Sequence, residues 1–358
     1  MNILKWAQLV ALLAAVSAPF CRSVVAQGFV DVLDTPAQIS SLAQHGLLVG
    51  LARAGERLVA VGQRGHILTS DDGAESWQQA RVPVSSDLVA VHFPSARHGW
   101  AVGHDGVVLH SADGGSNWER QFDGRQVGPA MLSHYQALAA LAPDDEKLAD
   151  LISEAQRMTE EGADKPFLDV WFENERVGYI VGAFNLFFRT EDGGRTWTPW
   201  MERTDNPSAL NLYAIRPAGN ELYIAGEQGL LLKLDHTTGR FESRPTPYSG
   251  SFFGILGKPG VALVFGLRGN VFRSVDGGAS WNQVETGLPA SITTGTQLAD
   301  GRLALLSQAG HLLVSGDDGA SFQLQPQQGQ VPVAAAQASG SDTLVLVGQR
   351  GARQLLVK

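Results

Sequence analysis

The chain has 358 residues, including 41 glycines and a single cysteine, and its formal net charge is −9. The acidic excess argues against sequence-independent binding of nucleic acid. A chain of this length can bury a sufficient core without disulfide bonds, so it is not a small disulfide-stapled domain.

Residues 1–26 have the pattern of a secretory signal peptide. Lys5 supplies the positive start, Leu9–Val16 is a short apolar core, and Val24-Val25-Ala26 offers the small residues of a cleavage site. The core is too short to span a bilayer, and no other segment is apolar enough. Cys21 lacks the small preceding residue of a lipidated cysteine. We expect cleavage near Ala26 and a mature chain, residues 27–358, in the bacterial periplasm or another exported compartment.

An eight-residue string that starts with a hydroxyl residue and ends with an aromatic residue occurs five times. The occurrences are Ser70–Trp77 (SDDGAESW), Ser111–Trp118 (SADGGSNW), Thr190–Trp197 (TEDGGRTW), Ser274–Trp281 (SVDGGASW) and Ser315–Phe322 (SGDDGASF). Its aspartate can accept hydrogen bonds from backbone N–H groups two residues on, and its glycines permit positive φ. The string, here named the Asp-box, is predicted to be a hairpin turn whose aromatic residue packs between neighbouring sheets.

The Asp-box residues are interpreted as structural. They are Asp72, Trp77, Asp113, Trp118, Asp192, Trp197, Asp276, Trp281, Asp317 and Phe322. Metal ligation or catalysis by the aspartates is the alternative. Because the boxes recur about every 40 residues, they should be distributed around a ring and could not converge on one substrate.

A second pattern, strand, G-x-x-G turn, strand, occurs seven times. It spans Ala60–Leu68, Ala101–Leu109, Ile180–Phe188, Ile224–Leu232, Val264–Phe272, Leu305–Leu313 and Leu346–Leu355. Successive occurrences are separated by 41, 79, 44, 40, 41 and 41 residues, where 79 is one period plus an insertion. The pattern predicts seven units, each with a two-residue hairpin between its central strands.

Each unit also opens with an alternating apolar run, such as Leu88–Phe93 (LVAVHF). Four strands per unit predict an all-β fold, a seven-bladed β-propeller with four-stranded blades. The fourth unit has only a degenerate Asp-box, Leu234–Phe241 (LDHTTGRF). The seventh unit ends after its third strand, and we expect Phe29–Leu33 (FVDVL) to add the outer strand and close the ring.

The insertion, from about 121 to 165, lies between blades 2 and 3 and is predicted to form two short helices joined near Ala142–Pro143. One helical face collects apolar residues, namely Leu148, Leu151, Ile152, Ala155 and Met158. The helices either cover the propeller or dock a partner, and both readings stay open. Strand order places the insertion on the face of the G-x-x-G turns, opposite the Asp-boxes.

The G-x-x-G turns carry the candidate partner-binding residues Arg64, Arg268 and Arg350, together with His104 and Asp105. Arg64 and Arg350 occur in the identical string VGQRG, in blades 1 and 7, which become neighbours when the ring closes. Three arginines on one rim could bind an anion or carboxylate. The alternative is that they are separate, solvated turn residues.

The combination of Asp-boxes with L-x-x-V-x-F and A-V-G-x-x-G-x-I-L strings resembles the photosystem II stability and assembly factor repeat family, which is grouped with the bacterial neuraminidase (BNR) repeat proteins. The resemblance covers about Phe29 to Lys358. It implies an exported seven-bladed propeller that holds a membrane-protein precursor on an arginine-bearing surface, here matched to Arg64, Arg268 and Arg350. By analogy with relatives in non-photosynthetic bacteria, it also implies a periplasmic accessory role beside transporters of the resistance-nodulation-division type.

The competing class is a sialidase-like glycoside hydrolase, which also carries Asp-boxes. Such enzymes need three arginines, a tyrosine nucleophile and a glutamate, and their early F-R-I-P-type string is absent here. Tyr179 and Tyr223 lie in apolar strand runs, which favours core packing. A glycosidase with two catalytic carboxylates stays open. The nine histidines lack metal-ligand spacing. We therefore predict a monomeric, non-enzymatic scaffold without metal or cofactor, which binds a membrane protein or membrane complex.

Overall fold

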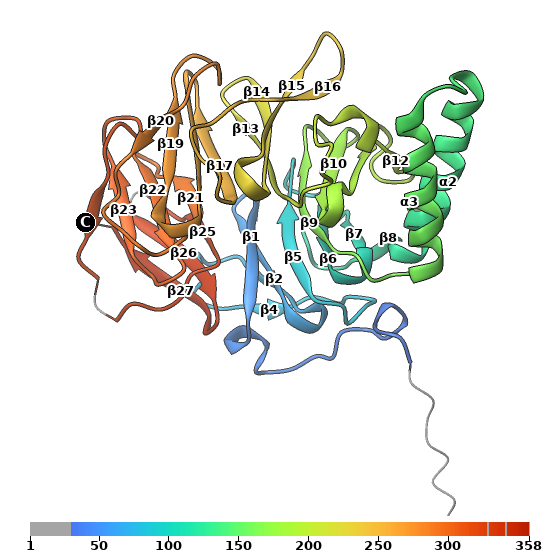
Figure 1. Cartoon of the computed structure of the whole chain (residues 1–358). Coiled ribbons are helices and arrows are strands. Elements are labelled where there is room, and N and C mark those ends of the chain that lie inside the picture. The colour runs from blue at the N-terminus through green and yellow to red at the C-terminus, as the bar shows by residue number, and fades with distance from the viewer. Residues whose placement is uncertain (1–29, 328, 341, 358) are drawn as a thin grey trace, which may run out of the picture. The chain divides into compact units, whose positions relative to one another are not determined.

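The computed structural model describes residues 30–327, 329–340 and 342–357, so the predicted signal peptide lies outside the described residues. Seven antiparallel sheets follow one another along the chain, as Figure 1 shows. Six sheets have four strands and the last has three. The sheets are the blades of a β-propeller, which confirms the predicted all-β, seven-bladed architecture.

The first strand of every blade lines a central cavity of about 220 Å³. These strands are β1 (Leu48–Ala54), β5 (Leu88–His92), β9 (Phe167–Phe172), β13 (Leu212–Ala218), β17 (Phe252–Lys258), β21 (Ile292–Gln297) and β25 (Ala335–Ala338). The second strands are β2 (Arg57–Gly62), β6 (Gly99–Gly103), β10 (Gly178–Gly182), β14 (Glu221–Gly226), β18 (Val261–Gly266), β22 (Leu303–Ser307) and β26 (Thr343–Gly348). Their near-continuous apolar sequences fit their burial on both faces, between adjacent blades.

The outer strands are shorter and more polar. The third strands are β3 (Ile67–Ser70), β7 (Val108–Ser111), β11 (Phe187–Thr190), β15 (Leu231–Asp235), β19 (Val271–Ser274), β23 (Leu312–Ser315) and β27 (Gly351–Leu356). The fourth strands are β4 (Gln78–Gln79), β8 (Glu119–Phe122), β12 (Thr198–Pro199), β16 (Arg240–Ser243), β20 (Asn282–Val284) and β24 (Gln323–Gln325). Polar residues accumulate here because each blade is solvated at its outer edge.

The prediction that Phe29–Leu33 adds a closing strand to blade 7 is wrong for the residues of this segment that the structure describes. Val32–Asp34 form a 3-10 turn, and the last sheet contains only β25, β26 and β27. Leu33 is buried in an apolar cluster with Val82 and Val84 of the link between blades 1 and 2. Among the described residues of the segment, Leu33 is buried against the link between blades 1 and 2, whereas Val30 is 62 % exposed.

The ring closes through side chains between blades 7 and 1. Val345 and Val347 of β26 share a buried cluster with Leu51 and Leu58 of blade 1. Gln337 donates to the carbonyl oxygen of Leu51, and the guanidinium of Arg53 donates to the carbonyl oxygen of Ala338 at 3.0 Å. Apolar packing and side-chain hydrogen bonds thus join the two ends of the repeat array.

The insertion contains helices α2 (Gly124–Leu141) and α3 (Glu146–Glu161), which confirms the predicted helical pair between blades 2 and 3. Asp123 caps α2 in a capping box with Gln126, and Asp145 caps α3. Figure 1 shows the two helices side by side next to blade 3.

Strand order defines two faces. The G-x-x-G turns and the connections between blades lie at one end of the strands, the G-x-x-G face. The turns between first and second strands and the Asp-boxes lie at the other end, the Asp-box face. Residues widely separated in sequence thereby share one surface.

Candidate functional site: the G-x-x-G face

Each G-x-x-G turn of blades 1 to 5 is a three-residue 3-10 turn and not the predicted two-residue hairpin. In blade 1, Gly62 and His66 close the loop by a backbone hydrogen bond of 3.0 Å, and Gln63–Gly65 form the turn. A Cβ at Gly62 would lie 2.1 Å from the carbonyl oxygen of Leu47, so the first glycine is required by this close approach. Blade 7 alone pairs Gly348 with Gly351 directly, as a two-residue loop.

The second residue of the turn has a left-handed backbone, which a side chain of the next blade stabilises. Arg64 has φ 55°, and its N–H donates to the Asp87 carboxylate at 2.6 Å. The N–H of Arg268, with φ 58°, donates to the Ser291 hydroxyl at 3.3 Å. Because strained turns persist only where their surroundings over-determine them, these hydrogen bonds fix the backbone from which the two arginine side chains project.

The three candidate arginines are exposed on this face, in blades 1, 5 and 7. Among the described residues, none forms a hydrogen bond or ion pair with their guanidinium groups. Arg64 and Arg350 lie on adjacent blades, whereas blade 6, whose turn carries Gln308 and Ala309, separates Arg268 from Arg350. The fold therefore pairs two of the arginines on neighbouring turns and leaves the third one blade further away.

His104 and Asp105 occupy the turn of blade 2, beside the start of α2. His104 is exposed, and Asp105 is partly buried. A Cβ at Gly124 would lie 2.7 Å from the carbonyl oxygen of Asp105, so the helix begins in direct contact with this turn. Of this pair, His104 is the more accessible to a partner.

The apolar stripe of the insertion is used within the molecule. Leu148, Ala155 and Met158 are buried in one cluster with aromatic residues of blade 3, and Leu151 and Ile152 pack against that cluster. The Tyr135 hydroxyl of α2 donates to the Glu202 carboxylate at 3.3 Å. The apolar side of the helices therefore covers the propeller. Only their polar side is left to bind a partner.

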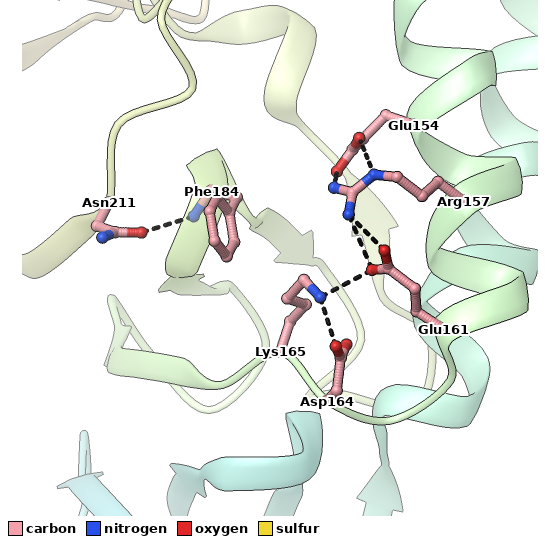
Figure 2. Close-up of polar contacts among 7 residues, drawn as sticks. All are labelled: Glu154, Arg157, Glu161, Asp164, Lys165, Phe184 and Asn211. Atoms are coloured by element: carbon pink, nitrogen blue, oxygen red, sulfur yellow. Dashed lines mark hydrogen bonds and ion pairs between the residues drawn. The ribbon is translucent and has the colours of Figure 1, made fainter.

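That polar side forms a charged chain near the turn of blade 3, which Figure 2 shows. Arg157 bridges Glu154 and Glu161, and the ammonium of Lys165 contacts Glu161 at 2.8 Å and Asp164 at 2.6 Å. Lys165 also lies 5.7 Å from the ring centroid of Phe184, at cation–π distance.

Phe184 was missed as a site residue by the sequence analysis. It is 49 % exposed, it has φ 53°, and its N–H donates to the Asn211 side chain at 2.8 Å. The sequence offered one signal for this residue. The same turn position is polar in most other blades and aromatic here. Its contact with Lys165 depends on how the insertion returns to the sheet, which sequence spacing does not indicate.

The Asp-boxes lie on the opposite face, and their geometry is uniform. In the third box, the Asp192 carboxylate accepts from the Thr190 hydroxyl at 2.8 Å and from the Thr196 N–H at 2.9 Å. The acceptor therefore serves an N–H four residues on, and not two as predicted. Hydrogen bonds from the Ser76 side chain and N–H and the Ser70 hydroxyl lower the pKa of the corresponding Asp72 carboxyl to about 2.

The aromatic residue that ends each Asp-box shares a buried apolar cluster with the preceding blade. The pairs are Trp77 with Val345, Trp118 with Val59, Trp197 with Trp100, Trp281 with Tyr223, and Phe322 with Leu263. Since the five carboxylates lie in five different blades, they do not meet at one site. Among the described residues, no set of three His, Cys, Asp or Glu side chains is arranged to hold a metal ion.

The central cavity bears on the glycoside hydrolase alternative. Among the described residues that line it, Arg216 is the single arginine, Tyr213 the single tyrosine, and no glutamate is present. Arg216 donates two hydrogen bonds, of 2.6 and 2.8 Å, to the buried Asp169 carboxylate. Burial raises the pKa of Asp169, against the opposing effect of Arg216. The cavity therefore does not present the free arginine triad that a sialidase uses for its substrate.

Comparison with known proteins agrees with this fold. A family model described as photosynthesis system II assembly factor YCF48 matches residues 43–133 and 150–282, which is more than half of the chain. The chain belongs to the YCF48 family. The gap between the two matched segments, residues 134–149, covers the end of α2 and the start of α3.

One curated YCF48 relative, the photosystem II assembly lipoprotein of Synechococcus sp. (strain CC9902), is 26 % identical over 156 residues. The match covers 42 % of this chain and 46 % of that protein, so the chain spans about half the length of this relative.

Solved structures match over more of the chain. YCF48 bound to a D1 peptide has a TM-score of 0.64 at 14 % identity, covering 90 % of this chain and 96 % of that one. YCF48 from Cyanidioschyzon merolae has a TM-score of 0.63 at 14 % identity, covering 90 % and 98 %. The WD40 propeller domain of Doa1 has a TM-score of 0.60 at 7 % identity, covering 90 % and 95 %. These structures establish the shared propeller fold.

Proposed function

We propose that this chain is an exported, non-enzymatic assembly or accessory factor that binds a membrane-protein partner on its G-x-x-G face. The observation that carries the proposal is the pair of exposed guanidinium groups of Arg64 and Arg350, on adjacent turns of a YCF48-family propeller, which have no partner among the described residues. A solved YCF48 is described as bound to a D1 peptide, which supports a partner of protein nature.

The chemistry of this face suits an acidic or carboxylate-bearing segment. Guanidinium groups bind carboxylates through two parallel hydrogen bonds, and fixed turns reduce the entropy lost on binding. Phe184 with Lys165, and the exposed His104, add an aromatic and a polar contact on the same face. Arg268, two blades from Arg350, would engage only a partner segment long enough to cross blade 6.

The sequence supports the proposed compartment, and analogy with relatives suggests the partner. Residues 1–26 have the pattern of a signal peptide, which supports export to the periplasm. Among the described residues, no helix is both long and apolar enough to cross a membrane. By analogy with relatives in non-photosynthetic bacteria, we extend the proposal to a transporter of the resistance-nodulation-division type as the partner.

Crosslinking in intact cells tests the proposal. A photoreactive residue replaces Gln63 or Gln349, beside the two arginines, and crosslinked products are identified by mass spectrometry. We expect an integral membrane protein in the products. The double variant Arg64→Glu/Arg350→Glu should lose this product, because charge reversal repels a carboxylate partner. Adding Arg268→Glu shows whether the third arginine contributes.

The matched control reverses the same amount of charge on the Asp-box face, with Arg97→Glu/Arg195→Glu, both at exposed positions. It should retain the crosslinked product, and circular dichroism should show all variants folded. Equal loss in both double variants, or retention in both, would contradict binding through the G-x-x-G face. Turnover of chromogenic glycosides by the purified mature chain would instead support the hydrolase class.

A further inference from the structure

The boundary between blades 3 and 4 differs from the boundaries that carry an Asp-box. At four of those boundaries the fifth residue of the box is a glycine that lies directly against the second strand of the preceding blade. A Cβ would lie within about 3 Å of that strand's side chain for Gly115 on Val59, Gly194 on Trp100, Gly278 on Tyr223 and Gly319 on Leu263. The Asp-box loop thus fills the space between two blades.

Blade 4 has no such loop. Its degenerate string Leu234–Phe241 forms a plain hairpin, in which the Gly239 N–H donates to the Asp235 carbonyl oxygen at 2.8 Å. Phe241, which replaces the box aromatic, fills the deep part of the boundary, 6.3 Å from the Tyr179 ring. Tyr179 lies at the position of the second strand that the Asp-box loop covers in other blades. In β10 it pairs with residues of the first and third strands, as Tyr223 does in β14.

A cavity of about 400 Å³ occupies this place. Blade 3 contributes Trp171, Tyr179, Arg189 and Trp200, and blade 4 contributes Leu222, Leu234, Glu221 and His236. A second cavity of about 460 Å³ shares Arg189 and Trp200 and is lined by Thr196 and Thr198. The two cavities lie on either side of the same arginine–tryptophan pair.

The aromatic wall is held in place by stacking across the strands. The Trp171 and Tyr179 rings are stacked at 6.0 Å, and the Arg189 guanidinium lies 5.8 Å from the Tyr179 ring and 4.6 Å from the Trp200 ring. Trp171, Tyr179 and Arg189 are direct cross-strand partners, so the sheet register fixes their order. Such a wall needs little reorganisation to bind a ligand.

Charges in the cavity are largely compensated. Arg189 pairs with Glu191 at 2.5 Å, and Glu221 pairs with Lys233 at 2.9 Å. A strongly charged ligand would therefore gain little there. A peptide added as a further strand is also disfavoured, because the edge strand of blade 3, β12, has two residues and one of them is Pro199.

We propose that the boundary between blades 3 and 4 binds an uncharged saccharide of one to three pyranose rings. The C–H groups on one face of a pyranose are attracted to the negative face of an aromatic ring. Its hydroxyls can exchange hydrogen bonds with the His236 imidazole, the Glu173 carboxylate and the Thr198 hydroxyl, which line the two cavities. The volume lies within the range of small-ligand sites. This site opens on the Asp-box face, away from the proposed protein partner.

Titration of the mature chain with chitotriose, cellotriose and maltotriose tests the proposal. Binding is measured by tryptophan fluorescence and by calorimetry. We expect saturable binding of at least one of the three. Trp200→Ala should weaken it about tenfold through loss of ring stacking, and Trp200→Phe should keep most of it. Phe184→Ala, an exposed aromatic on the opposite face, should leave the affinity unchanged.

A second variant restores the missing loop and keeps its length. Leu234→Ser, His236→Asp, Thr237→Gly and Thr238→Gly together recreate the Asp-box pattern on blade 4. We expect this variant to keep its denaturation midpoint and lose saccharide binding, because the loop fills the cavity. The proposal is overturned if no saccharide of the panel saturates, if binding survives both Trp200→Ala and the restored loop, or if a proline-rich peptide binds there and the saccharides do not.

Discussion

Two tyrosines at the same place in the repeat are both buried, but different elements cover them. Tyr223 of blade 4 is fully buried beneath the Asp-box of blade 5, with Trp281 edge-on at 6.0 Å. Tyr179 of blade 3 faces the degenerate string of blade 4 and lines a cavity with Trp171 and Trp200. The comparison teaches that the Asp-box fills space between blades, and that a recess is present at blade 4, where the box is degenerate.

The largest expected effect is a difference in the stability lost when a tryptophan is removed from the boundary between blades 4 and 5 or from that between blades 3 and 4. Trp281→Ala should lower the free energy of unfolding by about 3–5 kcal/mol, because a buried ring is lost from a boundary that cannot collapse. Trp200→Ala should cost clearly less, since its partly exposed ring borders two cavities. Guanidinium denaturation followed by circular dichroism measures both. Equal losses would contradict the distinction between filled and open boundaries.

Much of the fold was predictable because each repeat of the sequence corresponds to one blade. The near-constant spacing of G-x-x-G turns predicted seven blades, and the helical spacing of Leu148, Ala155 and Met158 predicted that they share one helical face, which the structure buries. Phe29–Leu33 was misassigned because a short apolar run does not indicate which neighbour its residues pack against. Leu33 finds that partner in Val82 and Val84, beneath blades 1 and 2.

The surfaces were less predictable than the blades. The arginines were placed on the correct face by strand order, but their left-handed turns and the hydrogen bond from Arg64 to Asp87 depend on the neighbouring blade. The degenerate box was visible in the sequence, yet its consequence was not. Trp171, Tyr179 and Arg189 meet only through the register of three strands.

Acid should weaken the boundaries that carry an Asp-box. Hydrogen bonds led by the Ser76 and Ser321 hydroxyls lower the pKa of Asp72 and of Asp317 to about 2. A carboxyl whose pKa is lower in the folded chain contributes stability that is present above pH ~4 and is lost as the pH falls from ~4 to ~2. Blade 4 has His236 at this position, and there the N–H groups of Thr237 and Thr238 lower the pKa of the neighbouring Asp235 carboxyl instead.

The double variant Asp72→Asn/Asp317→Asn checks that sign. It should be less stable than the parent chain at pH 7, and its denaturation midpoint should fall less between pH ~4 and pH ~2. His236→Asn, the matched change in the blade without a box, should leave the slope of stability with pH in this interval unchanged. A parallel pH profile for parent and double variant would show that the box carboxylates do not set the acid response.

The smallest expected effect compares two turn aspartates in adjacent blades. Asp192 accepts from the hydroxyls of Thr190 and Thr196 and from the Thr196 N–H, whereas Asp235 of blade 4 accepts only from the N–H groups of Thr237 and Thr238. Asp192→Ala should cost about 1 kcal/mol, because the box loses its central acceptor and its glycine no longer presses on Trp100. Asp235→Ala should cost less, since fewer hydrogen bonds to that carboxylate are lost. If denaturation shows the reverse order, the hydrogen-bonded box does not stabilise the blade boundary, and the recess at Tyr179 needs a different origin.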